Sequence, residues 1–385
     1  MFRKTRIAWL QLTYQKGRFL TASLGIAAAI TLMFIQLGLL GALDESNVVL
    51  HNHLRGDLVM LSVETEALVL SKDFSRRRLT QMLNFEAVKS VAPLYYSQRT
   101  FKNVDNARTR SIVVFGVNPN NSPLGFPSLD QQLDKITAVD VALFDENSRP
   151  EYGQIVEDFA AGRDSPVEVN GQRIKIGGII DFTGTSFGIT GNLVTSDFNF
   201  LRLSPEKSIE TISVGVISLT DGVDPDQVTL ELQAKLPEDV VVLTVEQFIE
   251  KEKIYWQQTT AVGFIFQTGA AVGFLIGMYI VYQILYTDVS DHIPDYALLK
   301  AKGYQKSYFW GVLVQEVLIL SLASYIPGFL LSTALYKIVN SGTKLPVFMT
   351  HERAILVLIL TFLMCLFSGF LVTRKLEESD PADLF

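Results

Sequence analysis

The chain of 385 residues is 48% hydrophobic and 19% charged, and its formal net charge is −7. This acidic balance argues against a protein that binds nucleic acid, because such proteins need basic surfaces to neutralise phosphates. The single cysteine, Cys365, excludes a framework of disulfides within the chain.

Four apolar runs stand out in the sequence. Each is long enough to cross a bilayer, since about 20 residues of helix span the hydrocarbon core of ~30 Å. They occupy residues 19–43, 261–286, 309–336 and 354–372. The first run is longer than the roughly 7 to 15 apolar residues of a signal peptide, so we interpret it as an uncleaved anchor. The pattern predicts a membrane α-helical protein with one helix, a large insertion and then three helices.

The distribution of charge predicts the orientation of these helices. Residues 1–18 contain five basic residues and no acidic one, which favours a cytoplasmic N-terminus. This segment predicts either an interfacial helix, residues 3–16, or a plain charged flank. Four crossings return residues 373–385 to the cytoplasm, as expected for a multi-pass protein of the plasma (inner) membrane. Alternation of sides assigns the other segments as follows: residues 44–253 to the periplasm, 287–308 to the cytoplasm and 337–353 to the outer side.

The inserted segment, residues 44–253, has the pattern of a large mixed α+β domain. It holds 31 acidic and 20 basic residues. Asn170-Gly171 between two strand-like runs predicts a tight hairpin. Strands are predicted at residues 57–61, 67–70, 111–117, 139–144, 167–169, 174–181, 213–219 and 240–244. Helices are predicted at residues 74–85 and 225–235, together with a continuation of the first membrane helix to about residue 54.

A charged helical segment precedes the second membrane run. Residues 245–258 include Glu250, Lys251, Glu252 and Lys253, and no proline separates them from the apolar run. One helix of about 42 residues and roughly 63 Å over residues 245–286 would form a stalk that stands clear of the bilayer. A break near residues 257–260 is the alternative, and the sequence leaves both open.

Small and charged residues in the membrane runs predict packing and function. Gly269, Gly273 and Gly277 lie on one helix face and let another backbone approach closely, in the same chain or in a second copy. Four membrane helices are few for a transport path, which favours a homodimer. Glu316 is an acid within a membrane run. It is either functional, or its side chain reaches the cytoplasmic interface or pairs with a lysine.

Motifs of catalysis are weak in this chain. No G-x-x-x-x-G-K-[ST] phosphate loop occurs, so we expect that the chain does not hydrolyse ATP. We also expect that it is not an enzyme and binds no cofactor. His51 and His53 are two apart in a predicted helix and would face different sides, which argues against a metal site. Residues 184–188, GTSFG, match the G-x-S-x-G pattern of a nucleophile elbow around Ser186. The residues that follow are poor helix formers, so a flexible loop is the favoured interpretation.

Two short segments carry a family resemblance. Residues 295–304, DYALLKAKGY, resemble the E-I-G-x-L-[RK]-A-x-G segment of the MacB/FtsX (type VII ABC transporter) permease family. Residues 380–385, DPADLF, resemble its terminal P-A-x-x-L, and the one-plus-three topology matches as well. Within that family the inserted segment most resembles the DevC-type permeases of cyanobacterial DevBCA exporters, on residues 111–119 and 139–153. Asp295 departs from the family glutamate but keeps its charge.

The resemblance implies the permease subunit of an ATP-dependent exporter that works by mechanotransmission. Its implied partners are a separate cytoplasmic ATPase that binds ATP and Mg²⁺, a periplasmic membrane-fusion adaptor, a TolC-like outer-membrane channel and a second copy of the chain. The implied substrate is a glycolipid or a similar amphiphile. A coupling helix within residues 287–308 is implied to dock on the ATPase. The residues implied in this coupling are Asp295, Leu298, Leu299, Lys300, Gly303 and Glu316.

Two other functions remain open from the sequence. FtsX-like proteins share this architecture but switch periplasmic cell-wall hydrolases instead of transporting a substrate. A membrane-anchored hydrolase that uses Ser186 as nucleophile is the third interpretation. The partner that binds the inserted segment distinguishes the first two, because an exporter would bind an adaptor there and a regulator would bind a hydrolase.

Overall fold

The structure is a computed structural model that describes residues 14, 16–104, 108–163, 165, 167–291, 302 and 306–378. The chain divides into two compact units. The first, here called the helical unit, comprises Met1–Gly41, Ala261–Asn340 and Val347–Phe385. The second, here called the inserted domain, comprises Ala42–Thr260 and Ser341–Pro346.

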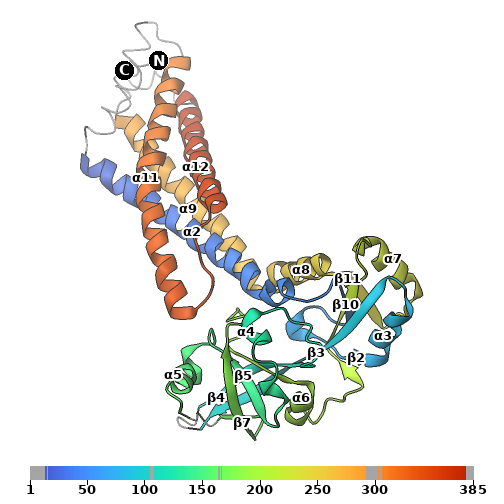
Figure 1. Ribbon diagram of the computed structural model, residues 1–385. Coiled ribbons are helices and arrows are strands. Elements are labelled where there is room, and N and C mark those ends of the chain that lie inside the picture. The colour runs from blue at the N-terminus through green and yellow to red at the C-terminus, as the bar shows by residue number, and fades with distance from the viewer. Residues whose placement is uncertain are drawn as a thin grey trace. The chain divides into compact units, whose positions relative to one another are not determined.

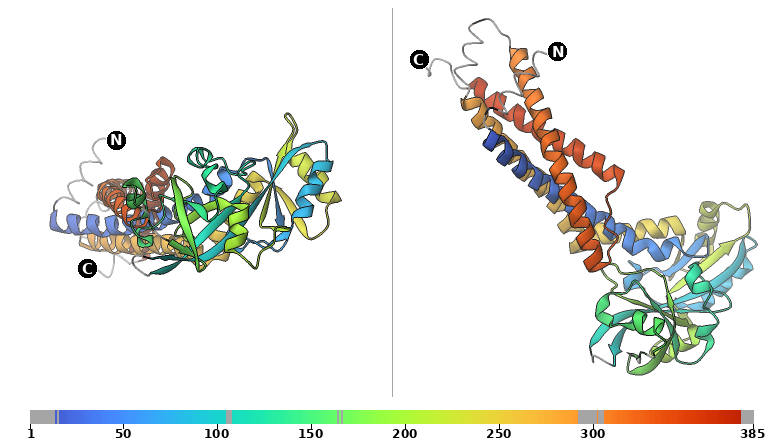
Figure 2. Two further views of the ribbon diagram at one scale, coloured as in Figure 1. Left: turned by 60° about the horizontal axis from the view of Figure 1, so that its bottom comes forward. Right: turned by 60° about the vertical axis from the view of Figure 1, so that its left-hand side comes forward.

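Long apolar helices form the helical unit. Within the described residues, four helices are long and apolar enough to cross a membrane, so the chain is a multi-pass membrane protein. They lie alongside one another in the views of Figures 1 and 2. Their bounds are α2 Lys16–Asn52, α9 Ala261–Asp291, α11 Lys306–Thr343 and α12 His351–Glu378. The first of them, α2, has the most buried apolar span of the four.

The glycine stripe of α9 faces α2 and α12 of the same chain. A Cβ atom added to Gly269 would lie 2.5 Å from the side chain of Gln36, and one added to Gly273 would lie 3.1 Å from that of Met33. On α11, a Cβ at Gly328 would lie 2.8 Å from Ile30. Within the chain, these glycines let α9 and α11 approach α2 closely.

The remaining helix faces of this unit are exposed and apolar. Phe264 on α9 is 65% exposed, and Leu330 on α11 is 62% exposed. Hydrocarbon or another protein surface is the compatible environment for such side chains. At one end of the unit Arg18 of α2 forms an ion pair of 2.6 Å with Asp291 of α9.

The described residues of the inserted domain form a nine-stranded sheet with the strand order β11-β1-β10-β3-β4-β8-β5-β7-β6 (Figure 1). Neighbouring strands run antiparallel except β4–β8 and β5–β7. The strands are β1 Leu58–Ser62, β3 Val88–Asn103, β4 Thr109–Val117, β5 Val141–Asp145, β6 Val167–Val169, β7 Gln172–Ile180, β8 Asn192–Ser196, β10 Val214–Leu219 and β11 Val240–Thr244. A small second sheet pairs β2 Phe74–Ser75 with β9 Thr211–Ile212.

Short helices accompany the sheet, and apolar side chains are buried on both of its faces. Along β1, Leu58 and Met60 belong to one buried cluster, whereas Val59 and Leu61 belong to the other. This alternation is the period-two pattern of a strand with both faces covered. The helices are α3 Arg76–Gln81, α4 Pro127–Asp130, α5 Ile155–Ala160, α6 Asp197–Leu203, α7 Pro225–Lys235 and α8 Val245–Ile254. Single 3₁₀ turns occur at Leu68–Leu70, Met82–Asn84, Lys135–Thr137 and Pro150–Tyr152.

The mixed α+β prediction for the insertion is confirmed, with local differences. β6, α7 and β11 have the predicted bounds. Asn170 and Gly171 join β6 to β7 with φ of 51° and 79°, the left-handed pair that a type I′ hairpin requires. The strand predicted at residues 67–70 is wrong, because those residues form a 3₁₀ turn. β3 and β8 had no counterpart among the predicted strands.

The prediction of one long stalk helix over residues 245–286 is wrong, and the alternative, a break near residues 257–260, is confirmed. α8 ends at Ile254 and continues as a π-helical turn, Tyr255–Thr259. Thr260 then has an extended backbone, with φ −93° and ψ 147°, before α9 begins at Ala261. The predicted interfacial helix, residues 3–16, lies almost wholly outside the described residues.

Candidate functional site

The C-terminal part of α2 lies beside α8 in the inserted domain. The ring centroids of His51 and Phe248 are 4.2 Å apart, and both side chains are buried. The Gln257 side chain donates to the two carboxylate oxygens of Asp44 at 2.8 Å each. These contacts join the C-terminal part of α2 to the segment that precedes α9.

The start of α8 is fixed by a capping box. The hydroxyl of Thr244 accepts a hydrogen bond from the backbone N–H of Gln247, and the Gln247 side chain accepts one from the backbone N–H of Thr244. Such a pair satisfies two N–H groups that the first turn of a helix leaves without partners. Helix α8 is therefore held at the end of β11, and its position follows that of the sheet.

Glu252 is the buried acid at the centre of this arrangement. Its side chain is 2% exposed and lies 3.6 Å from the buried ring of His51. One carboxylate oxygen accepts from the indole N–H of Trp256 and the other from the backbone N–H of Leu68, both at 2.9 Å. A buried carboxylate needs such donors, because an isolated charge in an apolar interior is strongly unfavourable. Glu252 thereby links α2, α8 and the Leu68–Leu70 turn.

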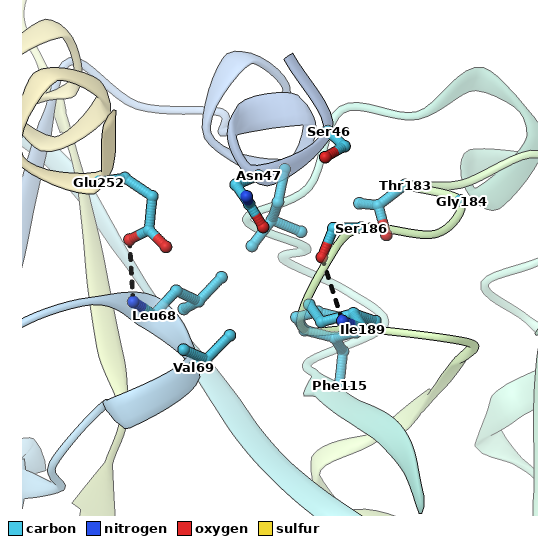
Figure 3. Close-up of a pocket in the computed structure, with 11 residues that line it drawn as sticks. Ser46, Asn47, Leu68, Val69, Phe115, Thr183, Gly184, Ser186, Ile189 and Glu252 are labelled. Atoms are coloured by element: carbon cyan, nitrogen blue, oxygen red, sulfur yellow. Dashed lines mark hydrogen bonds between the residues drawn. The ribbon is translucent and has the colours of Figure 1, made fainter. Parts of the chain in front are cut away.

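A small cavity adjoins Glu252 (Figure 3). Its volume is about 20 Å³, which is room for about one water molecule. Asn47 of α2, Leu68 and Ser186 point toward one another across it. The cavity lies between the end of α2 and the loop between β7 and β8.

Ser186 organises that loop, here called the junction loop (residues 182–191). Its hydroxyl accepts hydrogen bonds from the backbone N–H groups of Gly188 at 3.2 Å and Ile189 at 3.1 Å. The side chain is buried and no helix follows it before β8 begins at Asn192. A nucleophile elbow needs an exposed serine at a strand-to-helix turn. The structure therefore favours the loop interpretation of residues 184–188 over the hydrolase interpretation.

Asp145 anchors the junction loop to the end of β5. Its fully buried carboxylate accepts from the backbone N–H of Gly184 and the side chain of Asn192, both at 2.8 Å. It also accepts from the backbone N–H groups of Phe182 and Asn147. Burial raises the pKa of Asp145 to about 6, and these hydrogen bonds oppose the increase.

The junction loop contacts segments that adjoin three of the long helices. Together with Ser46 and Asn47 of α2 it lines the cavity described above. A Cβ at Gly188 would lie 2.8 Å from the ring of Trp256, which shortly precedes α9. The Thr185 hydroxyl donates to the carbonyl of Thr343, the last residue of α11, at 3.2 Å. A displacement of any of these segments would therefore act on a single loop anchored to the sheet.

Of the residues predicted to couple the chain to an ATPase, only Glu316 lies within the described residues. Asp295, Leu298, Leu299, Lys300 and Gly303 lie outside the described residues. Glu316 of α11 is fully buried in the helical unit, so an extension of its side chain to the aqueous interface is not seen.

The two predicted histidines have separate neighbours. His53 stacks on Phe126 with 4.2 Å between ring centroids, whereas His51 faces α8. Among the residues that the structure describes, no group of three or more His, Cys, Asp or Glu side chains could hold a metal ion.

Sequence reasoning missed Glu252 and Asp145. Glu252 lies among four consecutive charged residues of what looked like a solvated stalk. Its spacing of four residues from Phe248 and from Trp256, both buried, places the three on one helix face. That periodicity was the available signal. Asp145 directly follows an apolar strand, and nothing local distinguishes it from an exposed acid at the end of a strand.

Comparisons with known proteins identify the C-terminal helices. The family described as FtsX-like permease C-terminal matches residues 268–381, a range that takes in most of α9 and all of α11 and α12. This part of the chain is therefore similar to the C-terminal segment of FtsX-like permeases. No curated protein matches the chain.

Solved structures similar to the chain cover about half of it. One is the periplasmic region of MacB from Actinobacillus actinomycetemcomitans, at 10% identity and a TM-score of 0.35, covering 51% of this chain and 92% of that one. Another is the extracellular domain of the noncanonic ABC-type transporter YknZ from Gram-positive bacteria, at 14% identity and a TM-score of 0.32. It covers 49% of this chain and 100% of that one.

Proposed function

We propose that this chain is the permease subunit of an ATP-driven exporter, with the ATPase on a separate chain. The FtsX-like permease match over residues 268–381 carries the proposal. The proposed orientation places both termini in the cytoplasm and residues 44–253 in the periplasm, because residues 1–18 are strongly basic. In a cyanobacterium or another Gram-negative cell the membrane would be the inner one.

The geometry of the inserted domain supports transmission of force as the mechanism. Mechanotransmission requires that helix movements at the membrane reach the external domain without a transport path between the helices. In support of this mechanism, the junction loop contacts segments adjoining α2, α9 and α11 and is held to β5 by Asp145. The π-helical turn and the extended Thr260 provide a place where α8 and α9 can change their angle.

The proposed partners follow from the same role. A coupling helix within residues 287–308 would dock on the ATPase through Leu298 and Leu299, with Asp295 and Lys300 as polar partners and Gly303 ending the contact. Glu316 would follow in α11 as the membrane part of this coupling. A second copy of the chain, a periplasmic adaptor and a TolC-like channel complete the proposed tripartite assembly, and a glycolipid is the proposed substrate. A non-transporting regulator of cell-wall hydrolases is the second candidate, because it would share the same helices.

Affinity purification of the tagged full chain from its native cells in a mild detergent tests the proposal. Mass spectrometry should identify an ATPase and a periplasmic adaptor in the eluate. An ATPase with a cell-wall hydrolase and no adaptor would support the regulator instead. Recovery of the intact chain without any ATPase would contradict both functions.

A paired substitution tests the coupling residues. Leu298→Asp with Leu299→Asp should reduce the recovered ATPase at least tenfold, because two charges would replace the proposed apolar contact. Leu230→Asp is the matched control, since Leu230 is 74% exposed on α7 of the inserted domain. Undiminished ATPase recovery with the paired variant would show that the contact is elsewhere.

A further inference from the structure

A second hollow of the inserted domain lies apart from the junction loop. It is an open groove of about 730 Å³, within the roughly 300 to 1,000 Å³ of small-molecule sites. Helix α5 and the turn after it form one side, and the starts of β5 and β7 form the other, near one another in Figure 1. No part of the function proposed above uses this groove.

Apolar side chains line much of the groove, and some of them are exposed. Ile155, Ile174 and Ile176 belong to the buried core and form part of its lining. Val139 and Phe159 also line it, although they are 56% and 37% exposed. A water-filled groove with these walls would gain free energy by accepting an apolar chain.

Basic residues outnumber acidic ones among the described residues that line the groove, in contrast to the domain as a whole. The described lining includes Arg163, Arg173 and Lys175 against one acid, Asp140. Asp140 is paired with Arg202 at 3.1 Å, and Arg163 is paired with Asp158. Within the described part of the chain, neither Arg173 nor Lys175 has a carboxylate within ion-pair distance.

We propose that this groove binds a single-chain anionic amphiphile, with its apolar chain against the exposed side chains of Val139 and Phe159 and its anionic head at Arg173 and Lys175. The combination of cationic and exposed apolar lining is complementary to such a ligand, and the groove is of small-molecule size. This binding does not depend on the proposed function. Only the further interpretation, that the bound amphiphile is the exported substrate, rests on the proposed export function.

Photolabelling of the full chain in lipid nanodiscs tests the proposal. The probe is palmitic acid that carries a diazirine and an alkyne, and its methyl ester is the neutral control. Chymotryptic peptides are compared, because replacement of Arg and Lys does not alter their cleavage sites. The expected result is labelling within residues 139–177 by the acid, with at least fivefold less labelling by the ester.

Variants assign the charged end of the site. Arg173→Gln with Lys175→Gln should reduce this labelling at least fivefold. Arg77→Gln with Lys89→Gln, a matched pair that does not line the groove, should leave it unchanged. Labelling confined to the membrane helices, equal labelling by the ester, or full labelling of the Arg173/Lys175 variant would overturn the proposal. Displacement of the probe by polyglutamate as effectively as by palmitate would also overturn it and would indicate an acidic peptide ligand.

This test and that of the proposed function fail independently. Photolabelling needs neither ATP nor the ATPase. Loss of labelling with a normal ATPase and adaptor in the affinity purification would remove only the groove assignment. If the groove is labelled specifically but no ATPase co-purifies with the chain, the chain binds an amphiphile and the proposed export function is wrong.

Discussion

The helical unit and the inserted domain pack their interiors by different means. In the helical unit, glycines of α9 and α11 lie directly against side chains of α2, and large apolar residues point outward. In the inserted domain, large side chains such as Tyr95, Phe200 and Phe248 are fully buried. Lipid is as apolar as leucine, so helices in a membrane gain little from burying large apolar groups and associate through close packing. In water, the burial of apolar area is the main driving force.

The largest expected effect comes from truncating equivalent aromatic residues in the two units. Phe248→Ala should lower the free energy of unfolding of the inserted domain by about 3–5 kcal/mol, because it leaves a cavity beside His51. Phe264→Ala, at a residue 65% exposed on α9, should change stability by less than about 0.5 kcal/mol. Pulse proteolysis of the detergent-solubilised chain across a urea series measures both. Equal destabilisation by the two variants would show that the contrast between the units is wrong.

The next effect concerns the glycine stripe. Gly277→Leu should destabilise the helical unit by about 1–3 kcal/mol or more, since even a Cβ at this position would overlap Met364. Gly17→Leu is the control, because no atom lies within 4 Å of a Cβ there. Thermal loss of the monodisperse size-exclusion peak in detergent measures the effect. An unshifted midpoint for the Gly277 variant would mean that the stripe does not hold α9 against its neighbours.

The smallest effect is pH-dependent and belongs to the inserted domain. Burial raises the pKa of Asp145 from 3.8 to about 6. Between these two values the folded chain binds more protons at this site than the unfolded chain, so the contribution of Asp145 to stability falls as pH rises. From pH 4.5 to 7 the loss should be about 1–2 kcal/mol.

Asp145→Asn should remove this component of the pH dependence. The measurement is the difference in urea midpoint between pH 4.5 and 7, for the parent chain and the variant. Asp181→Asn is a suitable control, because this exposed carboxylate directly precedes the same loop and accepts a hydrogen bond from Asn147. An identical pH difference in the parent chain and the Asp145 variant would show that the carboxylate is not the titrating group.

Local patterns were sufficient where local forces decide structure. Asn170-Gly171 predicted its hairpin because the left-handed conformation of both residues depends on few neighbours. The helix Pro225–Lys235 begins after Asp224, whose side chain caps it by accepting from the backbone N–H of Asp226. The apolar runs predicted the long helices because membrane spans need about 20 consecutive apolar residues.

Long-range pairing decided what the patterns missed. β3 contains Pro93 and several polar residues, which argue against a strand. It forms nonetheless, because β10 pairs with its first half and β4 with its second, so that Leu94 faces both Val214 and Val117. The break at Thr260 likewise has no proline or glycine to mark it, and it coincides with the turn in which Gln257 bonds to Asp44 of α2.

The sequence by itself determined the number and order of the apolar runs, the mixed character of the insertion and the small-residue stripe of α9. Only the tertiary structure decided that the stripe faces α2 and α12, that Glu252 is buried whereas the neighbouring charged residues are not, and that the junction loop contacts segments adjoining three long helices. The physical reason is the range of the interactions. Hydropathy and turn preference act over a few residues, whereas the burial of a carboxylate or a glycine depends on partners that the chain supplies from more than a hundred residues away.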